Sequence, residues 1–381
     1  MSNESDRAEL SVMFLWTQFG PYHVDRCEAV AAARQRWSIV GLELESDSRE
    51  HYLWNATPAR GFVKRTLAAT RPDTAAGRLR RVAHVVQTGV SVGARHNFLC
   101  HYERIEVFVL AVILRLLGRR VYAMADSKFD DRARTPWREA LKRLFFVPYH
   151  GALVSGRRAR AYVAFLGMAR RPVVEGYDTV SIERVRSLAD VAPAPGGTPF
   201  AERRFVVISR FVAKKNLPLA IAAYDLYRRR VGAAARDLVV VGSGPLEAAL
   251  KADVCQRKLN GVTFTGFLQA DGVARQLGKA LALILPSFEE QWGLVVNEAL
   301  ALGVPVLCAD NVGACDTLVR NSINGHVFAA DDADVLAAHM ERLAGDEPHW
   351  RALATGALER ASAGDVSHFV EGVEALIAAA P

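Results

Sequence analysis

Short apolar runs of strand length alternate with helical stretches along most of the chain, and this alternation restricts the possible folds more than any other feature. The chain opens with an apolar run from Leu10 to Trp16 and a turn at residues 17–22. An alanine-rich helical stretch from Val24 to Arg36 and a second apolar run from Trp37 to Leu44 follow. A strand, helix, strand succession of this kind builds a parallel sheet with helices on its faces, so the sequence predicts an α/β protein.

The alternation occurs in two series, and a segment rich in proline and glycine separates them. In the first series we expect further strands at 81–88, 120–125 and 151–155, and helices at 106–117, 137–146 and 157–166. In the second we expect strands at 204–208, 237–241, 262–266, 281–285 and 304–308, with helices at 218–230, 246–257, 294–301, 350–360 and 366–379.

A chain of 381 residues suggests two domains of ordinary size. Residues 192–199 hold three prolines and two glycines, a composition typical of a linker. The predicted organisation is therefore an N-terminal Rossmann-like domain over 1–190, a linker over 191–200 and a C-terminal Rossmann-like domain over 201–362. A last helical segment over 363–381 completes it.

Charge is distributed unevenly between the two halves. Residues 60–170 contain 22 basic and 7 acidic side chains, whereas the half from 191 onward has a small acidic excess. Such a basic region favours an anionic partner, such as a membrane surface or a phosphorylated acceptor, although a solvated arginine-rich surface would have the same composition. Nucleic acid is not expected, because the sequence contains no helix-turn-helix or zinc-finger signature.

The chain has neither the start of a secretory signal nor an apolar stretch long enough to cross a bilayer, so we expect a cytoplasmic protein. The five cysteines are scattered and form no CxxC pair, which favours free buried thiols. The basic amphipathic stretch Trp137 to Phe146 can lie on an anionic membrane or contribute to the core. A peripheral position at the inner membrane face is thus one possible location.

Two acids flank a predicted helix start in the second half. Glu290 precedes Gly293, and Glu298 lies one turn inside the helix that Gly293 opens. The amides of Gly293, Leu294 and Val295 have no partner within the helix and can bind an anion, while each carboxylate can bind a sugar diol. The alternative is that the acids only supply favourable charge near the helix start.

Three further segments follow strands of the same half. Arg210 and Lys215 come after the strand at 204–208, and two cations there suit a diphosphate, although a solvated basic loop is the alternative. Gly242 and Gly244 follow the next strand, where glycine permits a close approach of backbone to ligand or simply a turn. Phe267 follows the strand at 262–266 and either presents its backbone to a base or belongs to the core.

Taken together, these segments resemble the retaining family-4 glycosyltransferases. The resemblance rests on Ser209-Arg210-Phe211 with Lys215-Asn216, Gly242-Ser-Gly244-Pro245, Gly266-Phe267, the E-x7-E motif Glu290…Glu298 and Asn324-Gly325. It implies the GT-B fold, an α/β architecture of two Rossmann-like, doubly wound domains facing a cleft. It also implies a final helix packed back on the N-terminal domain, a nucleotide-sugar donor, and neither a metal nor another cofactor.

The resemblance also assigns roles to residues. Arg210 and Lys215 would hold the donor diphosphate, Glu298 the ribose and Glu290 the transferred sugar. Backbone amides at Gly293, Leu294 and Val295 would bind sugar and phosphate, Phe267 would contact the base through its backbone, and Gly242 and Gly244 would line the donor site.

In the N-terminal half the resemblance is looser. Gly20 lies in a loop that resembles the family's first glycine-containing loop, near donor phosphate and acceptor. Asp126 stands where many members carry a functional histidine, so Asp126, His101 or His23 would assist the acceptor hydroxyl, or Asp126 only caps a turn.

The sequence therefore predicts a retaining glycosyltransferase of the hexosyltransferase type. It would move a sugar from a UDP- or GDP-sugar to a sugar or lipid-linked acceptor in the synthesis of a cell-surface polysaccharide or glycoconjugate. The alternatives are a sugar-nucleotide epimerase or phosphorylase of the same fold, and a non-catalytic protein that binds surfaces through its basic half.

Overall fold

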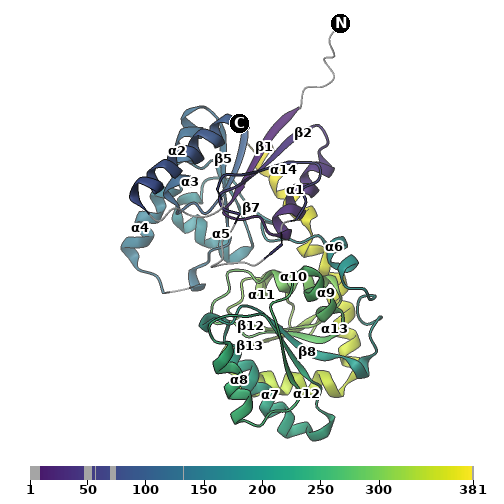
Figure 1. The fold of residues 1–381 in the computed structure, drawn as a ribbon. Coiled ribbons are helices and arrows are strands. Elements are labelled where there is room, and N and C mark those ends of the chain that lie inside the picture. The colour runs from purple at the N-terminus through teal and green to yellow at the C-terminus, as the bar shows by residue number, and fades with distance from the viewer. Residues whose placement is uncertain (1–8, 47–53, 56, 69–73, 132, 380–381) are drawn as a thin grey trace. The chain divides into compact units, whose positions relative to one another are not determined.

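The structure, a computed structural model, describes residues 9–46, 54, 55, 57–68, 74–131 and 133–379. It divides into two compact units (Figure 1). Unit 1 consists of Met1–Phe129, Ala133–Thr179 and Val366–Pro381, and unit 2 of Asp130–Arg132 and Val180–Asp365. The segment 191–200, expected as a linker, thus lies within unit 2, while the last helix lies in unit 1.

Unit 1 contains a seven-stranded parallel sheet in the order β3-β2-β1-β4-β5-β6-β7. The strands are β1 Leu10–Trp16, β2 Trp37–Glu43, β3 Val63–Thr66, β4 His96–Cys100, β5 Arg120–Ala125, β6 Gly151–Val154 and β7 Val173–Glu175. The helices are α1 Pro21–Ala33, α2 Ala75–Ser91, α3 Ile105–Leu116, α4 Pro136–Phe145, α5 Arg157–Val163 and α14 Val366–Ala378.

The central strands of the unit 1 sheet are covered on both faces, which explains why a strand such as β1 is almost entirely apolar. Alternate residues of β1 belong to two different cores: Met13 and Leu15 pack with α2 and α3, whereas Phe14 and Trp16 pack with α1 and α14. A strand buried on both faces loses the apolar-polar alternation of a surface strand, as is usual in parallel sheets.

The expected strand at 81–88 is wrong, because these residues lie inside helix α2. Arg81, Val85 and Gly89 recur every fourth residue and are all buried, which is a helical spacing. Gly89 permits close packing, since a Cβ there would lie 2.7 Å from the side chain of Leu110 in α3. The short valine-rich run suggested a strand, but helix packing decides its structure, and β4 at His96–Cys100 takes the place in the sheet.

Unit 2 contains a six-stranded parallel sheet in the order β10-β9-β8-β11-β12-β13. The strands are β8 Arg204–Ile208, β9 Leu238–Val241, β10 Val262–Gly266, β11 Ala280–Leu285, β12 Val306–Ala309 and β13 Gly325–Phe328. The helices are α6 Ile182–Leu188, α7 Leu217–Val231, α8 Glu247–Gln256, α9 Ala270–Gly278, α10 Leu294–Ala301, α11 Cys315–Leu318, α12 Ala333–Gly345 and α13 Glu347–Arg360.

The two sheets confirm the prediction of an α/β protein with two Rossmann-like halves. The cysteines differ in part from the expectation of buried thiols: all five are free, four of them are buried, and Cys255 is exposed. Among the described residues, none of the helices combines the length and apolar character that crossing a membrane requires.

Candidate functional site

The strand order of unit 2 brings the predicted donor-site segments to one edge of its sheet. Strands β10, β9, β8 and β11 are neighbours, and the loops that follow them carry Phe267, Gly242 and Gly244, Arg210 and Lys215, and Glu290, respectively. The strand order reverses between β8 and β11, because β9 and β10 lie on one side of β8 and β11 to β13 on the other. Open α/β sheets bind ligands at the carboxyl end of such a switch point.

An ion pair joins the two loops at this switch point. Lys215, from the loop after β8, donates from Nζ to Oε2 of Glu290, from the loop after β11. The Ser287 hydroxyl donates to the same oxygen at 3.3 Å. Side-chain exposures of 12% for Lys215 and 14% for Glu290 show that the pair is largely buried but still reaches solvent. A ligand at this edge would therefore meet both charges.

Asn216, the residue after Lys215, helps to fix the two loops that carry this pair. Its backbone is left-handed, with φ of 52°, at the start of α7. Its side-chain amide donates to the carbonyl oxygens of Pro286 at 3.1 Å and Ala330 at 2.7 Å. The amide N–H of Phe288 also donates to the carbonyl oxygen of Lys214 at 2.9 Å, so the loops after β8 and β11 are joined through their backbones as well.

Gly242 and Gly244 are required by the approach of the β9 loop to the β8 loop. Their φ angles are 132° and 152°, and a Cβ on Gly242 would lie 1.8 Å from the carbonyl oxygen of Ser209. A Cβ on Gly244 would lie 2.7 Å from the carbonyl oxygen of Phe211, whose N–H donates to Ser243 at 2.8 Å. Close packing of the two loops therefore accounts for both glycines without a ligand, because only glycine allows the loop of Arg210 and Lys215 to pack against its neighbour.

Helix α10 begins beside Glu290. Gly293 is left-handed, with φ of 101°, and the helix starts at Leu294, so the amides of residues 293–295 form its first turn. The backbone carbonyl of Glu290 accepts from the N–H of Gly313 at 3.1 Å, which fixes the loop before the helix. Glu298 is buried one turn inside α10, whereas Phe267 is exposed after β10. Phe267 is therefore not a core residue.

Gly20 and Asp126 lie in unit 1, after β1 and β5. The N–H of Gly20 donates to His23 Nδ1 at 2.9 Å, and the Trp54 ring lies where a Gly20 Cβ would stand, 2.1 Å from its position. Burial, together with the positive charge of Arg26, lowers the pKa of His23 well below its ordinary value. His23 is thus a neutral acceptor that holds the Gly20 loop. The ring of His101 lies 3.9 Å from a Glu103 carboxylate oxygen.

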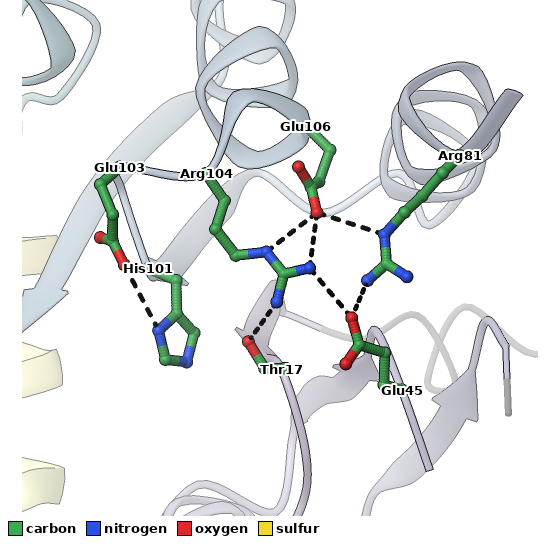
Figure 2. Close-up of polar contacts among 7 residues, drawn as sticks. All are labelled: Thr17, Glu45, Arg81, His101, Glu103, Arg104 and Glu106. Atoms are coloured by element: carbon green, nitrogen blue, oxygen red, sulfur yellow. Dashed lines mark hydrogen bonds and ion pairs between the residues drawn. The ribbon is translucent and has the colours of Figure 1, made fainter. Parts of the chain in front are cut away.

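A buried ionic network at the carboxyl edge of the unit 1 sheet was not predicted (Figure 2). Arg104 donates to Glu106 at 2.9 Å, to Glu45 at 2.9 Å and to the Thr17 hydroxyl at 3.1 Å. Arg81 joins the same two carboxylates, at 2.6 Å to Glu45 and 3.2 Å to Glu106. The network spans the β1–β4 switch point of unit 1 and fixes the loop that leads from Thr17 to Gly20.

The network also determines the charge of Glu106. Burial by itself raises the pKa of its carboxyl. A backbone hydrogen bond and the guanidinium groups of Arg104 and Arg81 lower that pKa, and together they outweigh the effect of burial. The net pKa lies below the ordinary value, so Glu106 is ionised at neutral pH. No sequence signal identified this cluster, because it joins four separate segments of the chain, at Thr17, Glu45, Arg81 and residues 104–106, and none of its members belongs to a short motif.

Within the described parts of the chain, no group of three or more His, Cys, Asp or Glu side chains is arranged to hold a metal ion. Glu290 of the candidate site lies beside a cation, the ammonium of Lys215.

Comparisons with known proteins agree with this geometry. Residues 194–360 match the model of a family described as glycosyl transferases group 1, and the match includes every predicted site residue of unit 2. The D-inositol 3-phosphate glycosyltransferase of Frankia alni is 34% identical over 160 residues, which cover 40% of this chain and 39% of that protein. The chain matches about two fifths of the length of such curated relatives.

Solved structures resemble nearly the whole chain. The sucrose-phosphate synthase of Thermosynechococcus elongatus has a TM-score of 0.73 at 16% identity, covering 97% of this chain and 98% of that one. Anabaena HepE, in complex with UDP and glucose, has a TM-score of 0.70 at 16% identity, covering 97% and 100%. These likenesses confirm the prediction of a GT-B fold. Support for a transferase enzyme comes from the family match over residues 194–360.

Proposed function

We propose that the protein is a retaining glycosyltransferase. In this proposal it transfers a sugar from a UDP- or GDP-sugar to a sugar or lipid-linked acceptor, in the synthesis of a cell-surface polysaccharide or glycoconjugate. The observation that carries the proposal is the Lys215–Glu290 pair at the β8–β11 switch point, within the segment that matches glycosyl transferases group 1. The UDP and glucose in HepE support a nucleotide-sugar donor.

The chemistry of the donor explains why cations are needed at this edge. When a glycosidic bond to a nucleoside diphosphate breaks, negative charge collects on the leaving diphosphate. Arg210 and Lys215, in the loop after β8, would stabilise that charge, and the first-turn amides of α10 would add to the same field. Their positive charge would take the place of a metal ion, so we expect transfer without a divalent cation.

The acids of the same edge bind the hydroxyl groups of the donor. Glu290 contacts the transferred sugar, and its ion pair keeps the Lys215 ammonium beside that sugar and hence beside the scissile bond. Glu298, buried within α10, accepts from the ribose hydroxyls. The backbone at Phe267 contacts the base.

The acceptor side of the proposal rests on unit 1. Its Gly20 loop is fixed from one side by Arg104 through Thr17 and from the other by the carboxylate of Glu43, which accepts from the N–H of Phe19 at 2.7 Å. A loop held in this way is suited to positioning a hydroxyl acceptor. Asp126 would accept the proton or hydrogen bond of that hydroxyl. A cytoplasmic location and contact with an anionic membrane complete the proposal.

The test is a transfer assay with a panel of UDP- and GDP-sugars and the release of nucleoside diphosphate as readout. Lys215→Met and Glu290→Gln should each lower kcat by at least about a hundredfold, the size typical for loss of one preorganised charge at a transition state. The exposed residues Lys258 and Glu359 provide matched controls as Lys258→Met and Glu359→Gln, which should keep wild-type rates.

The products separate the alternatives. A product anomer with the configuration of the donor sugar, seen by NMR, supports retention, whereas an inverted anomer contradicts it. An epimerised donor, or turnover that requires inorganic phosphate, indicates the epimerase or phosphorylase. Folded Lys215→Met and Glu290→Gln proteins with near-normal turnover would refute the site assignment.

A further inference from the structure

Helix α4 of unit 1 turns its apolar side outward. Trp137, Leu141 and Leu144 recur at spacings of four and three and form one stripe along the helix. Their exposed fractions are 63%, 50% and 57%, whereas Glu139, on the opposite side, is only 5% exposed. A helix that packs on a core to bury apolar surface has the reverse arrangement. The stripe on α4 is therefore available to a partner.

Polar contacts hold α4 in this orientation. The Glu139 carboxylate accepts from the Tyr162 hydroxyl of α5 at 2.5 Å and from Lys142 Nζ at 2.8 Å. Lys142 Nζ also contacts the Tyr162 hydroxyl at 2.9 Å, and Arg134 lies 3.7 Å from Glu139. Rolling the helix to bury its apolar stripe would break these contacts and leave a buried carboxylate unpaired.

Further exposed apolar side chains lie around the same helix. The ring of Phe129 is 5.0 Å from that of Tyr162 and 5.1 Å from that of Phe165, and both phenylalanines are exposed. Val147, just beyond the end of α4, is exposed as well. We call Trp137, Leu141, Leu144, Val147 and Phe165 the α4 face.

The segment that carries the α4 face is strongly basic. Residues 132–174 contain ten arginines and lysines and a single acid, Glu139, which is buried and neutralised by the contacts above. Arg138, Arg143 and Arg170 are exposed, and the Arg138 guanidinium lies 5.3 Å from the centre of the Trp137 ring. An apolar stripe with arginines beside it matches an anionic bilayer, whose headgroups are negative and whose acyl chains accept Trp and Leu.

We propose that the α4 face is a membrane-docking surface that inserts Trp137, Leu141 and Leu144 into the interface of an anionic lipid bilayer. Arg138 and Arg143 pair with the headgroups on either side of the stripe. The apolar side chains supply insertion and the arginines supply selectivity for anionic lipid, so neither part is sufficient alone. The surface does not depend on the chemistry at Lys215 and Glu290.

The test is cosedimentation of the full chain with vesicles of phosphatidylcholine alone or mixed with phosphatidylglycerol, without donor or acceptor. We expect binding to the mixed vesicles that weakens with added salt, and much weaker binding to the neutral ones. Each arginine removed should weaken binding about fivefold, so Arg138→Gln/Arg143→Gln should lose roughly thirtyfold. Leu141→Ser/Leu144→Ser should lose binding to both kinds of vesicle.

Controls come from unit 2, where Ile323→Ser and Arg351→Gln change exposed residues of the same types and should leave binding unchanged. Insertion should also shift the fluorescence of the wild-type protein to the blue on vesicles, and Trp137→Phe should remove most of that shift. Equal melting temperatures of the variants exclude misfolding as the cause.

Absence of binding to the mixed vesicles, or equal binding by the α4 variants and the wild type, would overturn the proposal. Binding without transferase activity would leave it standing and would instead count against the proposed function.

Discussion

Asn216 offers a quantitative test of how the loops beside the candidate site are held. Its side-chain amide makes two buried hydrogen bonds, to Pro286 and Ala330, worth about 1 kcal/mol each in net stability. Its left-handed backbone, with φ of 52°, costs a residue such as alanine about 1 kcal/mol more. Asn216→Ala should therefore lower the free energy of unfolding by about 3 kcal/mol.

Replacement by glycine separates the two contributions. Asn216→Gly loses the hydrogen bonds but not the conformational preference, so we expect a loss of about 2 kcal/mol. In a unit of this size, 1 kcal/mol changes the melting temperature by about 2–4 °C. Thermal unfolding followed by circular dichroism should thus show a decrease of about 6–12 °C for the alanine variant and about 4–8 °C for the glycine variant.

Lys258 provides the control, because it has nearly the same backbone conformation, with φ of 54°, and an exposed side chain. Lys258→Gly should be neutral or slightly stabilising. An Asn216→Ala protein that melts with the wild type, or an Asn216→Gly protein that melts below the Asn216→Ala protein, would refute the account of how Asn216 holds the two loops.

Further predictions concern close packing, pH and the unit 1 network. Gly242→Ala should cost more than about 3 kcal/mol, because its Cβ would lie 1.8 Å from a carbonyl oxygen, whereas Gly232→Ala, with open space around its Cβ, should cost about 1 kcal/mol in the same thermal assay. Burial lowers the pKa of His326 to about 4, so below pH 6.5 the unfolded chain takes up a proton that the folded chain does not. The free energy of unfolding of the wild type should therefore decrease by up to about 3 kcal/mol between pH 6.5 and pH 4. Thermal scans of His326→Gln should lack that part of the decrease. Arg104→Met should cost about 3 kcal/mol, since it breaks buried ion pairs while Arg81 still neutralises part of the charge. For the glycine and arginine substitutions, a melting temperature equal to that of the wild type would contradict the prediction. For His326→Gln, a loss of stability between pH 6.5 and pH 4 as large as that of the wild type would contradict it.

The sequence predicted the fold wherever apolar runs were long and bounded by turns. Strands β1, β8 and β11 are buried on both faces, and their uninterrupted apolar character made them recognisable. Residues 81–88 were assigned wrongly, because a short valine-rich run has no period that distinguishes a strand from a buried helix. Only the packing of Gly89 on α3 resolves the ambiguity.

The candidate site was predictable in one unit and not in the other. In unit 2 the residues follow successive strands, so parallel topology alone brings Lys215 and Glu290 to the same edge. In unit 1 the network joins Thr17, Arg81 and Arg104 from separate loops and helices. Such contacts depend on helix packing that no spacing in the sequence encodes. The outward stripe of α4 shows the same limit, because its helical period does not reveal which side is buried.

The central claim is that the carboxyl edge of the unit 2 sheet binds a nucleotide sugar. Hydrogen exchange measured by mass spectrometry, with and without saturating UDP and GDP, tests it directly. The account predicts that one of the two nucleotides protects the backbone amides of residues 209–216, 242–246, 266–268 and 287–298 and leaves α12 unchanged. Lys215→Met should reduce that protection. Protection confined to other segments, or none in the four loops with either nucleotide, would contradict the claim.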